Sequence, residues 1–122
     1  MLQYWVRDRK SGRISLQEAI RRQCHDTAVL YGLNDRGVLA EGYLADLNII
    51  DMSAIRLGAP WVARDLPAGG RRLLQQADGY VATIKSGCVT FLEGKMQGPT
   101  PGGLIRGPQA VQASSAGREM AQ

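Results

Sequence analysis

The sequence predicts an α+β fold in which helices come first and a mostly antiparallel β-region follows. Up to residue 33, apolar residues recur at helical spacing, and capping signals mark where the helices begin and end. From residue 34 onward, the helical period gives way to short apolar runs separated by glycine-containing turns, which is typical of strands. We therefore expect about four to six short strands after the helices.

The first residues are typical of the end of a helix. Residues 2–6 are mainly apolar and residues 7–10 mainly basic, and cations favour the C-terminal end of a helix. Residues 11–12, Ser-Gly, then break the helix. Such a beginning indicates a truncated chain. We expect Leu2 and Trp5 to have covered a missing surface, so that they are now exposed or buried in a contact between copies.

A second helix begins at a capping box. The Ser15 side chain is expected to accept from the Glu18 amide, and the Glu18 side chain to reach back to the Ser15 amide. The helix continues to residue 23, and one buried face is expected from its apolar positions Leu16, Ala19, Ile20 and Cys24. Asp26 is interpreted as the N-cap of a short helix over residues 27–31, which Gly32 ends.

The β-region is expected to begin with two short strands, Val38-Leu39 and residues 47–50, joined by a turn at Glu41-Gly42. Residues 52–67 are ambiguous and are interpreted as an irregular excursion packed by its own side chains. Two further strands are predicted at the end of the region. They are residues 79–84 and 89–91, joined by a two-residue turn in which Gly87 takes a positive φ.

Composition narrows the class of protein. The 122 residues carry 15 basic and 11 acidic side chains, a net charge of +4, and the cations are scattered without interleaved aromatics. This pattern argues against a nucleic-acid partner.

Cys24 and Cys88 are too few for a disulfide scaffold and predict free, partly buried thiols in a reducing compartment. No apolar run is long enough to span a membrane, and we expect a cytoplasmic protein.

Four segments carry a resemblance to a known family. Residues 35–48 form a segment that is shared by many metal-dependent amidohydrolases, and within it residues 37–47 show the pattern G-x-L-x-x-G-x-x-A-D-L. Residues 65–73, Asp-Leu-Pro-Ala-Gly-Gly-Arg-Arg-Leu, are narrower in their distribution. Together with residues 16–33 and 83–106, they resemble the end of an amidohydrolase of the D-aminoacylase (N-acyl-D-amino-acid deacylase) group.

The resemblance implies a division of the chain. Residues 1–33 correspond to the final helical segment of a (β/α)8 barrel, and residues 34–106 to the C-terminal half of the family's composite β-sandwich. Residues 107–122 are expected to be a disordered tail. The resemblance also implies a parent enzyme that uses zinc-activated water to hydrolyse non-peptide C–N bonds.

No catalytic, cofactor-binding or metal residue is predicted in this chain. It contains a single histidine, His25, and no His-x-His pair, so zinc is expected only in the full-length family. His25, although it lies between Cys24 and Asp26, is interpreted as a residue of the junction between two helices. Asp46 is interpreted as a hydrogen-bond acceptor for turn backbone rather than as a catalytic acid.

One ligand site is left open. Gly69 and Gly70 allow close approach of an anion, and Arg71 or Arg72 has the chemistry to pair with a carboxylate. The alternative is a bend that leads into an arginine-rich surface. A Gly-Gly step is not a phosphate-loop pattern, so the bend is the preferred reading.

The sequence therefore predicts a structural C-terminal fragment of a metal-dependent amidohydrolase that is inactive alone. The expected partner is the missing barrel portion or a second copy of the chain, with neither nucleic acid nor a membrane. The alternative function is a free-standing β-rich module for binding or oligomerisation, because open sheet edges seek partners.

Overall fold

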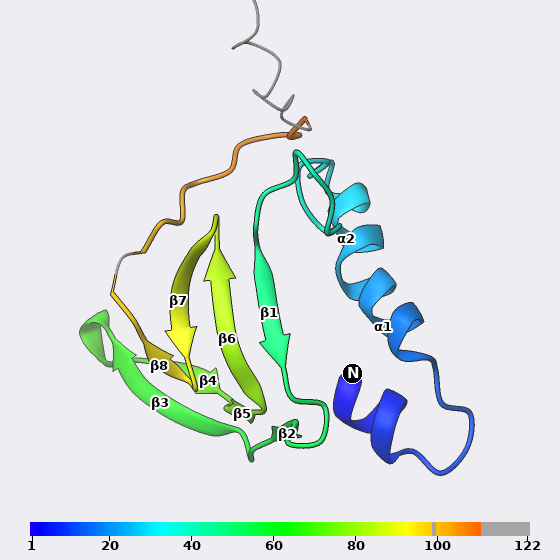
Figure 1. Ribbon diagram of the computed structural model, residues 1–122. Coiled ribbons are helices and arrows are strands. Elements are labelled where there is room, and N and C mark those ends of the chain that lie inside the picture. Colours follow the sequence, from blue (N-terminus) through cyan, green and yellow to red (C-terminus); the bar gives the residue numbers. More distant parts are fainter. Residues whose placement is uncertain (99, 111–122) are drawn as a thin grey trace, which may run out of the picture.

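The computed structural model describes residues 1–98 and 100–110, and it combines helices with antiparallel sheets (Figure 1). The helices are η1 (Leu2–Asp8), which is of the π type, α1 (Leu16–Gln23), α2 (His25–Leu30) and the 3-10 turn η2 (Pro67–Gly69). The strands are β1 (Leu47–Ile50), β2 (Arg56–Leu57), β3 (Trp61–Leu66), β4 (Gly70–Leu74), β5 (Ala77–Asp78), β6 (Tyr80–Lys85), β7 (Cys88–Leu92) and β8 (Lys95–Met96).

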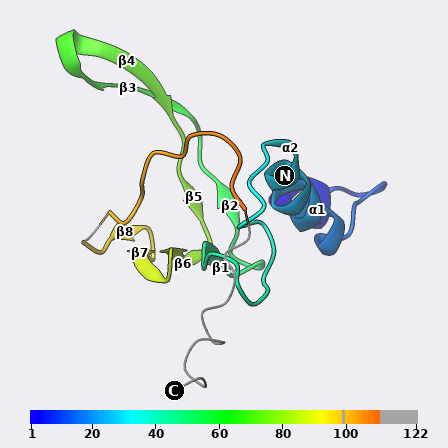
Figure 2. The ribbon, with the colours of Figure 1, turned by 90° about the horizontal axis from the view of Figure 1, so that it is seen from above.

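The prediction of an α+β fold is confirmed, but the strand count was too low. The described residues carry eight strands instead of four to six, because β2, β5 and β8 are pairs of only two residues. The main sheet has the order β1-β6-β7-β8, whereas β2–β5 and β3–β4 form separate two-stranded sheets. Every pairing between these strands is antiparallel. Helices α1 and α2 lie beside β1 in two perpendicular views (Figures 1 and 2).

The predicted two-residue turn between β6 and β7 is confirmed. Lys85 pairs with Cys88, and the two residues between them, Ser86 and Gly87, have φ values of 51° and 80°. Two successive positive φ values define the type I′ turn, whose twist matches that of the flanking strands.

The start of α1 follows the capping box only in part. The Ser15 hydroxyl oxygen accepts from the Glu18 amide at 3.1 Å, as predicted. Glu18 does not reach back to Ser15. Its carboxylate instead accepts from Arg22 at 2.7 Å and from Arg21 at 3.3 Å, because cations three and four residues ahead lie on the same helix face.

The second helix begins earlier than predicted. It starts at His25 with Cys24 as its N-cap, so Asp26 lies within the first turn and is not the cap. Its end is as expected, because Gly32 has a φ of 69° and donates to Val29 at 3.0 Å. The Leu33 amide donates to the Ala28 carbonyl at 2.8 Å, which completes a Schellman motif.

The hydrophobic core is small and joins the N-terminal helices to the loop after β1. Leu2, Ala19 and Ile55 form its buried cluster, with exposed fractions of 7%, 0% and 4%. The expectation that Leu2 lacks an internal partner was therefore wrong, because Leu2 packs within this chain. Trp5 remains exposed, and the Arg9 guanidinium lies 4.3 Å from its ring centroid.

The predicted buried face of α1 was also largely wrong. Of its four apolar positions only Ala19 is buried, whereas Leu16, Ile20 and Cys24 are exposed. The helical period places these residues on one face, but a face becomes buried only where another element packs against it.

Two predictions in the β-region were wrong. Val38 and Leu39 form no strand, because their loop is closed by its own hydrogen bond from the Leu44 amide to the Asp35 carbonyl at 2.8 Å. Residues 52–67 contain both β2 and β3. The strand β3 pairs with β4 as a hairpin that projects from the rest of the molecule (Figure 2). The strand β3 forms because it pairs with β4, which comes later in the chain. The local sequence pattern of residues 52–67 does not reveal this pairing.

The C-terminal segment returns across the molecule to α2 (Figure 1). The Asn34 amide donates to the Gln109 carbonyl at 3.1 Å, and the Gln109 amide donates to the Gly32 carbonyl at 2.8 Å. A tail remains a prediction for residues 111–122, which lie outside the described residues. Among the residues described, none of the helices has the length and hydropathy of a membrane-crossing segment.

We predict that Leu2→Ala lowers the free energy of unfolding by about 2–4 kcal/mol, because it leaves a cavity in a core with few other members. The matched control is Leu30→Ala, since Leu30 is 81% exposed. That variant should lie within about 0.5 kcal/mol of the unmodified chain. Urea unfolding followed by circular dichroism measures both, and equal losses would contradict the assignment of Leu2 to the core.

Candidate functional site

A cluster of charged side chains lies where β1 begins. The Arg36 Nε and Nη2 atoms donate to the two carboxylate oxygens of Asp35 at 2.9 and 3.0 Å. Its Nη1 atom donates to Asp46 Oδ2 at 3.3 Å. From the other side, Lys85 Nζ donates to Asp46 Oδ1 and Oδ2 at 2.9 and 3.1 Å. The two acids and two bases compensate one another in charge.

Asp46 also holds the turn between β6 and β7. The Ser86 amide donates to Asp46 Oδ1 at 2.9 Å, and the Gly87 amide donates to the Ala45 carbonyl at 3.0 Å. The expectation that Asp46 accepts from turn backbone agrees with this geometry. The turn belongs to a hairpin 40 residues later in the chain, which the sequence did not indicate.

Both carboxylates in the cluster have lowered pKa values. Partial burial on its own raises the pKa of Asp46, but hydrogen bonds from Lys85 and the Ser86 amide outweigh it and hold the pKa below its usual value. For Asp35, the hydrogen bonds from Arg36 are the main cause of the lowered pKa. Carboxylates held in the ionised form in this way do not fit a general acid–base catalyst that works near neutral pH.

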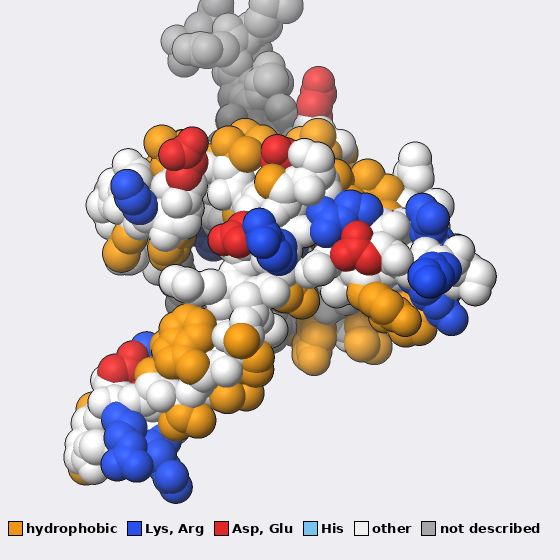
Figure 3. Space-filling view, turned by 90° about the horizontal axis from the view of Figure 1, so that it is seen from below, with side chains coloured by type: hydrophobic (Ala, Val, Ile, Leu, Met, Phe, Trp, Pro, Cys, Tyr) orange, Lys and Arg blue, Asp and Glu red, His pale blue; other side chains and the backbone are white. Residues whose placement is uncertain are grey.

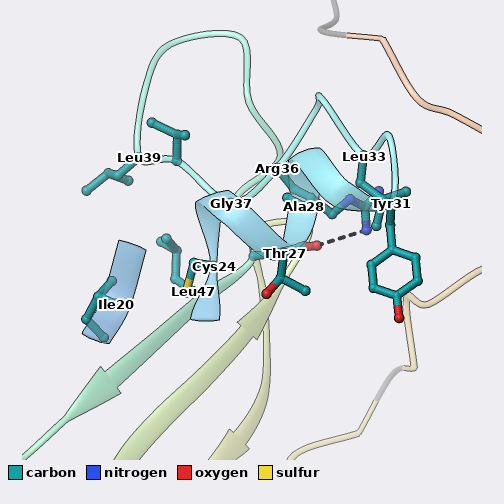
Figure 4. A pocket seen from close by; sticks show the side chains of 12 residues that line it. Ile20, Cys24, Thr27, Ala28, Tyr31, Leu33, Arg36, Gly37, Leu39 and Leu47 are labelled. Carbon is teal, nitrogen blue, oxygen red and sulfur yellow. Dashed lines mark hydrogen bonds and ion pairs between the residues drawn. The ribbon is translucent and has the colours of Figure 1, made fainter. Parts of the chain in front are cut away.

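An apolar pocket of about 400 Å³ lies beside the cluster (Figure 4). Figure 4 shows Ile20, Leu39 and Leu47 around one end of it, and Tyr31 at the other. Its walls come from both helices, the loop after α2 and the start of β1. The lining residues are Ile20, Cys24, Thr27, Ala28, Tyr31, Leu33, Arg36, Gly37, Val38, Leu39, Asp46 and Leu47. Arg36 and Asp46 are its only charged lining groups among the described residues, and they bind each other.

Gly37 sets how closely the loop approaches α2. Its φ is 87°, and a Cβ atom at this position would lie 2.8 Å from the Ala28 Cβ and 2.9 Å from the Cys24 carbonyl oxygen. Both distances are shorter than van der Waals contact, so only glycine fits without moving the helix.

A family model of the amidohydrolase family matches residues 1–91 of this chain. The chain belongs to the amidohydrolase family. No curated protein and no solved structure gives a significant match. The matched region includes both helices, the charged cluster and the pocket, and it ends within β7.

The described residues of this amidohydrolase do not supply a cluster of metal ligands. Among residues 1–98 and 100–110, no three His, Cys, Asp or Glu side chains lie together as a metal site requires. His25 is about half exposed, and its Nδ1 atom lies 3.0 Å from Asp26 Oδ1. Asp26 also lies 3.7 Å from Arg21 Nε, so its carboxylate is already paired. These residues do not fit a zinc centre.

The arginine segment of this amidohydrolase is divided between two roles. Arg72 donates to both carboxylate oxygens of Asp65, at 2.8 and 2.5 Å, so its guanidinium is occupied within the chain. The side chain of Arg71 is exposed, and no carboxylate of the described residues lies within 4.0 Å of it.

Sequence reasoning singled out Asp46 but missed Asp35, Arg36 and Lys85 as its companions. Asp35 and Arg36 stood within the family pattern, and their charges next to a glycine turn were the available signal. Nothing near Lys85 in the sequence indicated Asp46, because the contact forms only when β6 pairs with β1.

The stability of this amidohydrolase chain should fall in acid. The pKa values of Asp35 and Asp46 are lower in the folded than in the unfolded state, so their contribution is present above about pH 4 and is lost as pH falls through the folded values. We predict that Asp46→Asn lowers the free energy of unfolding by about 1–3 kcal/mol at pH 7 and reduces its decline toward pH 3. Urea unfolding across this range measures both effects.

The control for Asp46→Asn is Glu41→Gln, since Glu41 is an exposed acid with no ion pair to any described side chain. It should leave the pH profile nearly unchanged. An identical pH profile for Asp46→Asn and the unmodified chain would contradict the assigned role of Asp46.

We predict that Gly37→Ala is more destabilising than Gly87→Ala. Both glycines have a positive φ, so both variants lose about 1–2 kcal/mol from the strained backbone. Gly87 faces open space, whereas the new methyl group at Gly37 collides with Ala28 and adds about 1–3 kcal/mol. The difference between the two free energies of unfolding measures the collision, and equal values would show that the loop does not contact α2 as described.

Proposed function

We propose that this chain is the C-terminal structural part of a metal-dependent amidohydrolase of the D-aminoacylase (N-acyl-D-amino-acid deacylase) type, and that it is inactive alone. The parent reaction is hydrolysis of a non-peptide C–N bond, such as the N-acyl group on a D-amino acid. The family match over residues 1–91 carries the proposal. The segment at residues 65–73 supports the narrower assignment to the D-aminoacylase type.

The distribution of side-chain chemistry supports a structural role. The charged cluster around Asp46 is internally neutral and holds a turn, and the pocket beside it is lined mainly by apolar groups. Zinc-dependent hydrolysis requires a zinc ion that is held by imidazole or carboxylate ligands and keeps one coordination position open. The described residues do not supply such a set of ligands. The ligands are assigned to a barrel portion outside these 122 residues.

The exposed apolar side chains of the two helices support a partner of that kind. A stable soluble domain rarely leaves many large apolar side chains of neighbouring helices in water. On α1, α2 and the residue after them, the exposed ones are Leu16, Ile20, Val29, Leu30 and Tyr31. We assign this face to contact with the barrel portion, and a second copy of the chain is the alternative partner.

A free-standing β-rich binding or oligomerisation module is the second candidate function. The observation in its favour is the β3–β4 hairpin, which pairs with no further strand among the described residues. This candidate requires the chain to assemble with its own copies, and a monomeric chain in solution would exclude that form of it.

A cytoplasmic location is proposed on the chemistry of the thiols. Cys24 and Cys88 are both free, and both are exposed and not partly buried as expected. Exposed unpaired thiols are favoured in a reducing compartment.

The purified 122-residue chain is predicted to show no zinc-dependent hydrolysis of N-acyl-D-amino acids and no tight zinc binding by calorimetry. The test compares it with an amidohydrolase whose chain carries a His-x-His segment upstream of a region similar to this one, which should hydrolyse the D substrate. The matched N-acyl-L-amino acid tests the stereochemical assignment in that longer protein. Zinc-dependent turnover by the isolated chain would contradict the proposal.

A further inference from the structure

The two faces of the β3–β4 hairpin differ in charge. Strand pairing sets Val62 opposite Leu73 and Ala63 opposite Arg72. Because side chains alternate between faces, Arg71 shares a face with Leu73 and Val62. Arg64 lies two residues after Val62, at the start of the register shift between Ala63 and Leu66. We call this surface the Arg71 face; its residues are Val62, Arg64, Arg71 and Leu73.

The opposite face of the hairpin is neutralised within the chain. It carries Arg72, whose guanidinium binds both oxygens of Asp65. A bidentate pair of this geometry satisfies the cation and the acid together. On this face of the hairpin, the charge of Arg72 is therefore neutralised by Asp65, whereas the arginines of the Arg71 face have no such acidic partner among the described residues.

The Arg71 face combines exposed cations with exposed aliphatic groups. Arg64 and Arg71 are exposed, and no carboxylate of the described residues lies within 4.0 Å of either. Val62 is 62% exposed and Leu73 is 70% exposed. Figure 3 shows basic side chains gathered at the free end of the hairpin, next to hydrophobic ones. Arg64 on β3 and Arg71 on β4 carry like charges, and like charges on neighbouring strands destabilise a sheet. An anionic partner would relieve this repulsion and also add contacts.

The backbone of the hairpin provides a further binding feature. The sheet consists of β3 and β4 alone, so each strand has one edge that no other described strand covers. The hairpin projects away from the main sheet, which leaves these edges accessible (Figure 2). An isolated two-stranded hairpin is marginally stable in water, and an added strand both stabilises it and satisfies its free backbone groups.

We propose that the Arg71 face and the adjoining strand edge bind an extended, acidic segment of a partner protein. On β4, Arg71 and Leu73 are two residues apart and point to the same face. In a strand added beside β4, every second residue also lies on this face. The segment that fits has an aliphatic residue and a carboxylate at this spacing. Backbone hydrogen bonds hold the segment, and the charge pattern selects it.

Charge and geometry disfavour the other occupants. Two copies that meet through the same face would bring their arginines together, which opposes a symmetric self-contact. A lipid surface would contact the aliphatic groups, but hydrocarbon offers no partner for free strand edges. Single-stranded nucleic acid is bound by stacking on aromatic rings, and the aromatic residue of the hairpin, Trp61, lies with Leu74 on the opposite face.

The test uses the 122-residue chain and two fluorescein-labelled peptides of seven residues. In the first, glutamate and valine alternate at every second position, with threonine between them. In the second, lysine replaces each glutamate. Fluorescence anisotropy at low salt should show binding of the glutamate peptide at least about tenfold tighter than that of the lysine peptide, and binding should weaken as salt is added.

Charge reversal separates the Arg71 face from a general effect of net charge. The double variant Arg64→Glu/Arg71→Glu should lose at least about tenfold in affinity for the glutamate peptide and gain affinity for the lysine peptide, which an unfolded protein cannot do. The matched control is the double variant Lys10→Glu/Arg106→Glu, which changes the net charge by the same amount at two exposed residues outside the hairpin. It should change the affinity less than about threefold.

Three results would overturn the proposal. One is equal binding of the two peptides by the unmodified chain, and another is an equal loss of affinity in the Lys10→Glu/Arg106→Glu control. The third is binding to vesicles of anionic lipid, lost in the double variant, without binding of the glutamate peptide. None of these measurements depends on zinc or on hydrolysis, so they separate this inference from the proposed amidohydrolase role.

Discussion

The Asp46 carboxylate connects the parts of this chain that are distant in sequence. It lies one residue before β1, accepts from Arg36 in the loop after α2, and accepts from Lys85 and the Ser86 amide at the turn between β6 and β7. One side chain thereby joins the helical segment, the edge strand and the central hairpin. With a core of few buried residues, this polar contact fixes the relative position of layers that hydrophobic packing alone holds weakly.

The small core also explains why the surface is unusually apolar. Apolar side chains remain exposed on helix and strand faces that the amphipathic pattern predicts to be buried. Examples are Ile20 on α1 and Leu73 on β4. A chain of this length that buries so little is consistent with a part that completes a larger assembly. The proposed role as one part of a larger amidohydrolase accounts for these exposed faces.

Local features of the fold could be predicted from the sequence, and features that depend on distant partners could not. The Ser15 cap, the Gly32 helix end and the turn at Gly87 each involve neighbours within a few residues, and all three are present. The burial of Leu2 and the cluster around Asp46 join segments far apart, so periodicity and capping rules contain no signal for them. In the candidate site, the role of Asp46 was predictable and Arg36 lay in the matching segment, but Lys85 contacts Asp46 only because β1 pairs with β6.

The C-terminal segment returns to residues 32–34, and this contact determines the side of the molecule on which residue 110 lies. Because Gln109 is bonded on both sides of Leu33, the described polypeptide departs from the helical side and not from the far edge of the sheet at β8. A fluorescent reporter or affinity handle joined after residue 110 would thus emerge next to α2, close to the apolar surface of the helices. Placing such a label at the opposite, sheet-edge side would require an insertion at the turn between β7 and β8 instead.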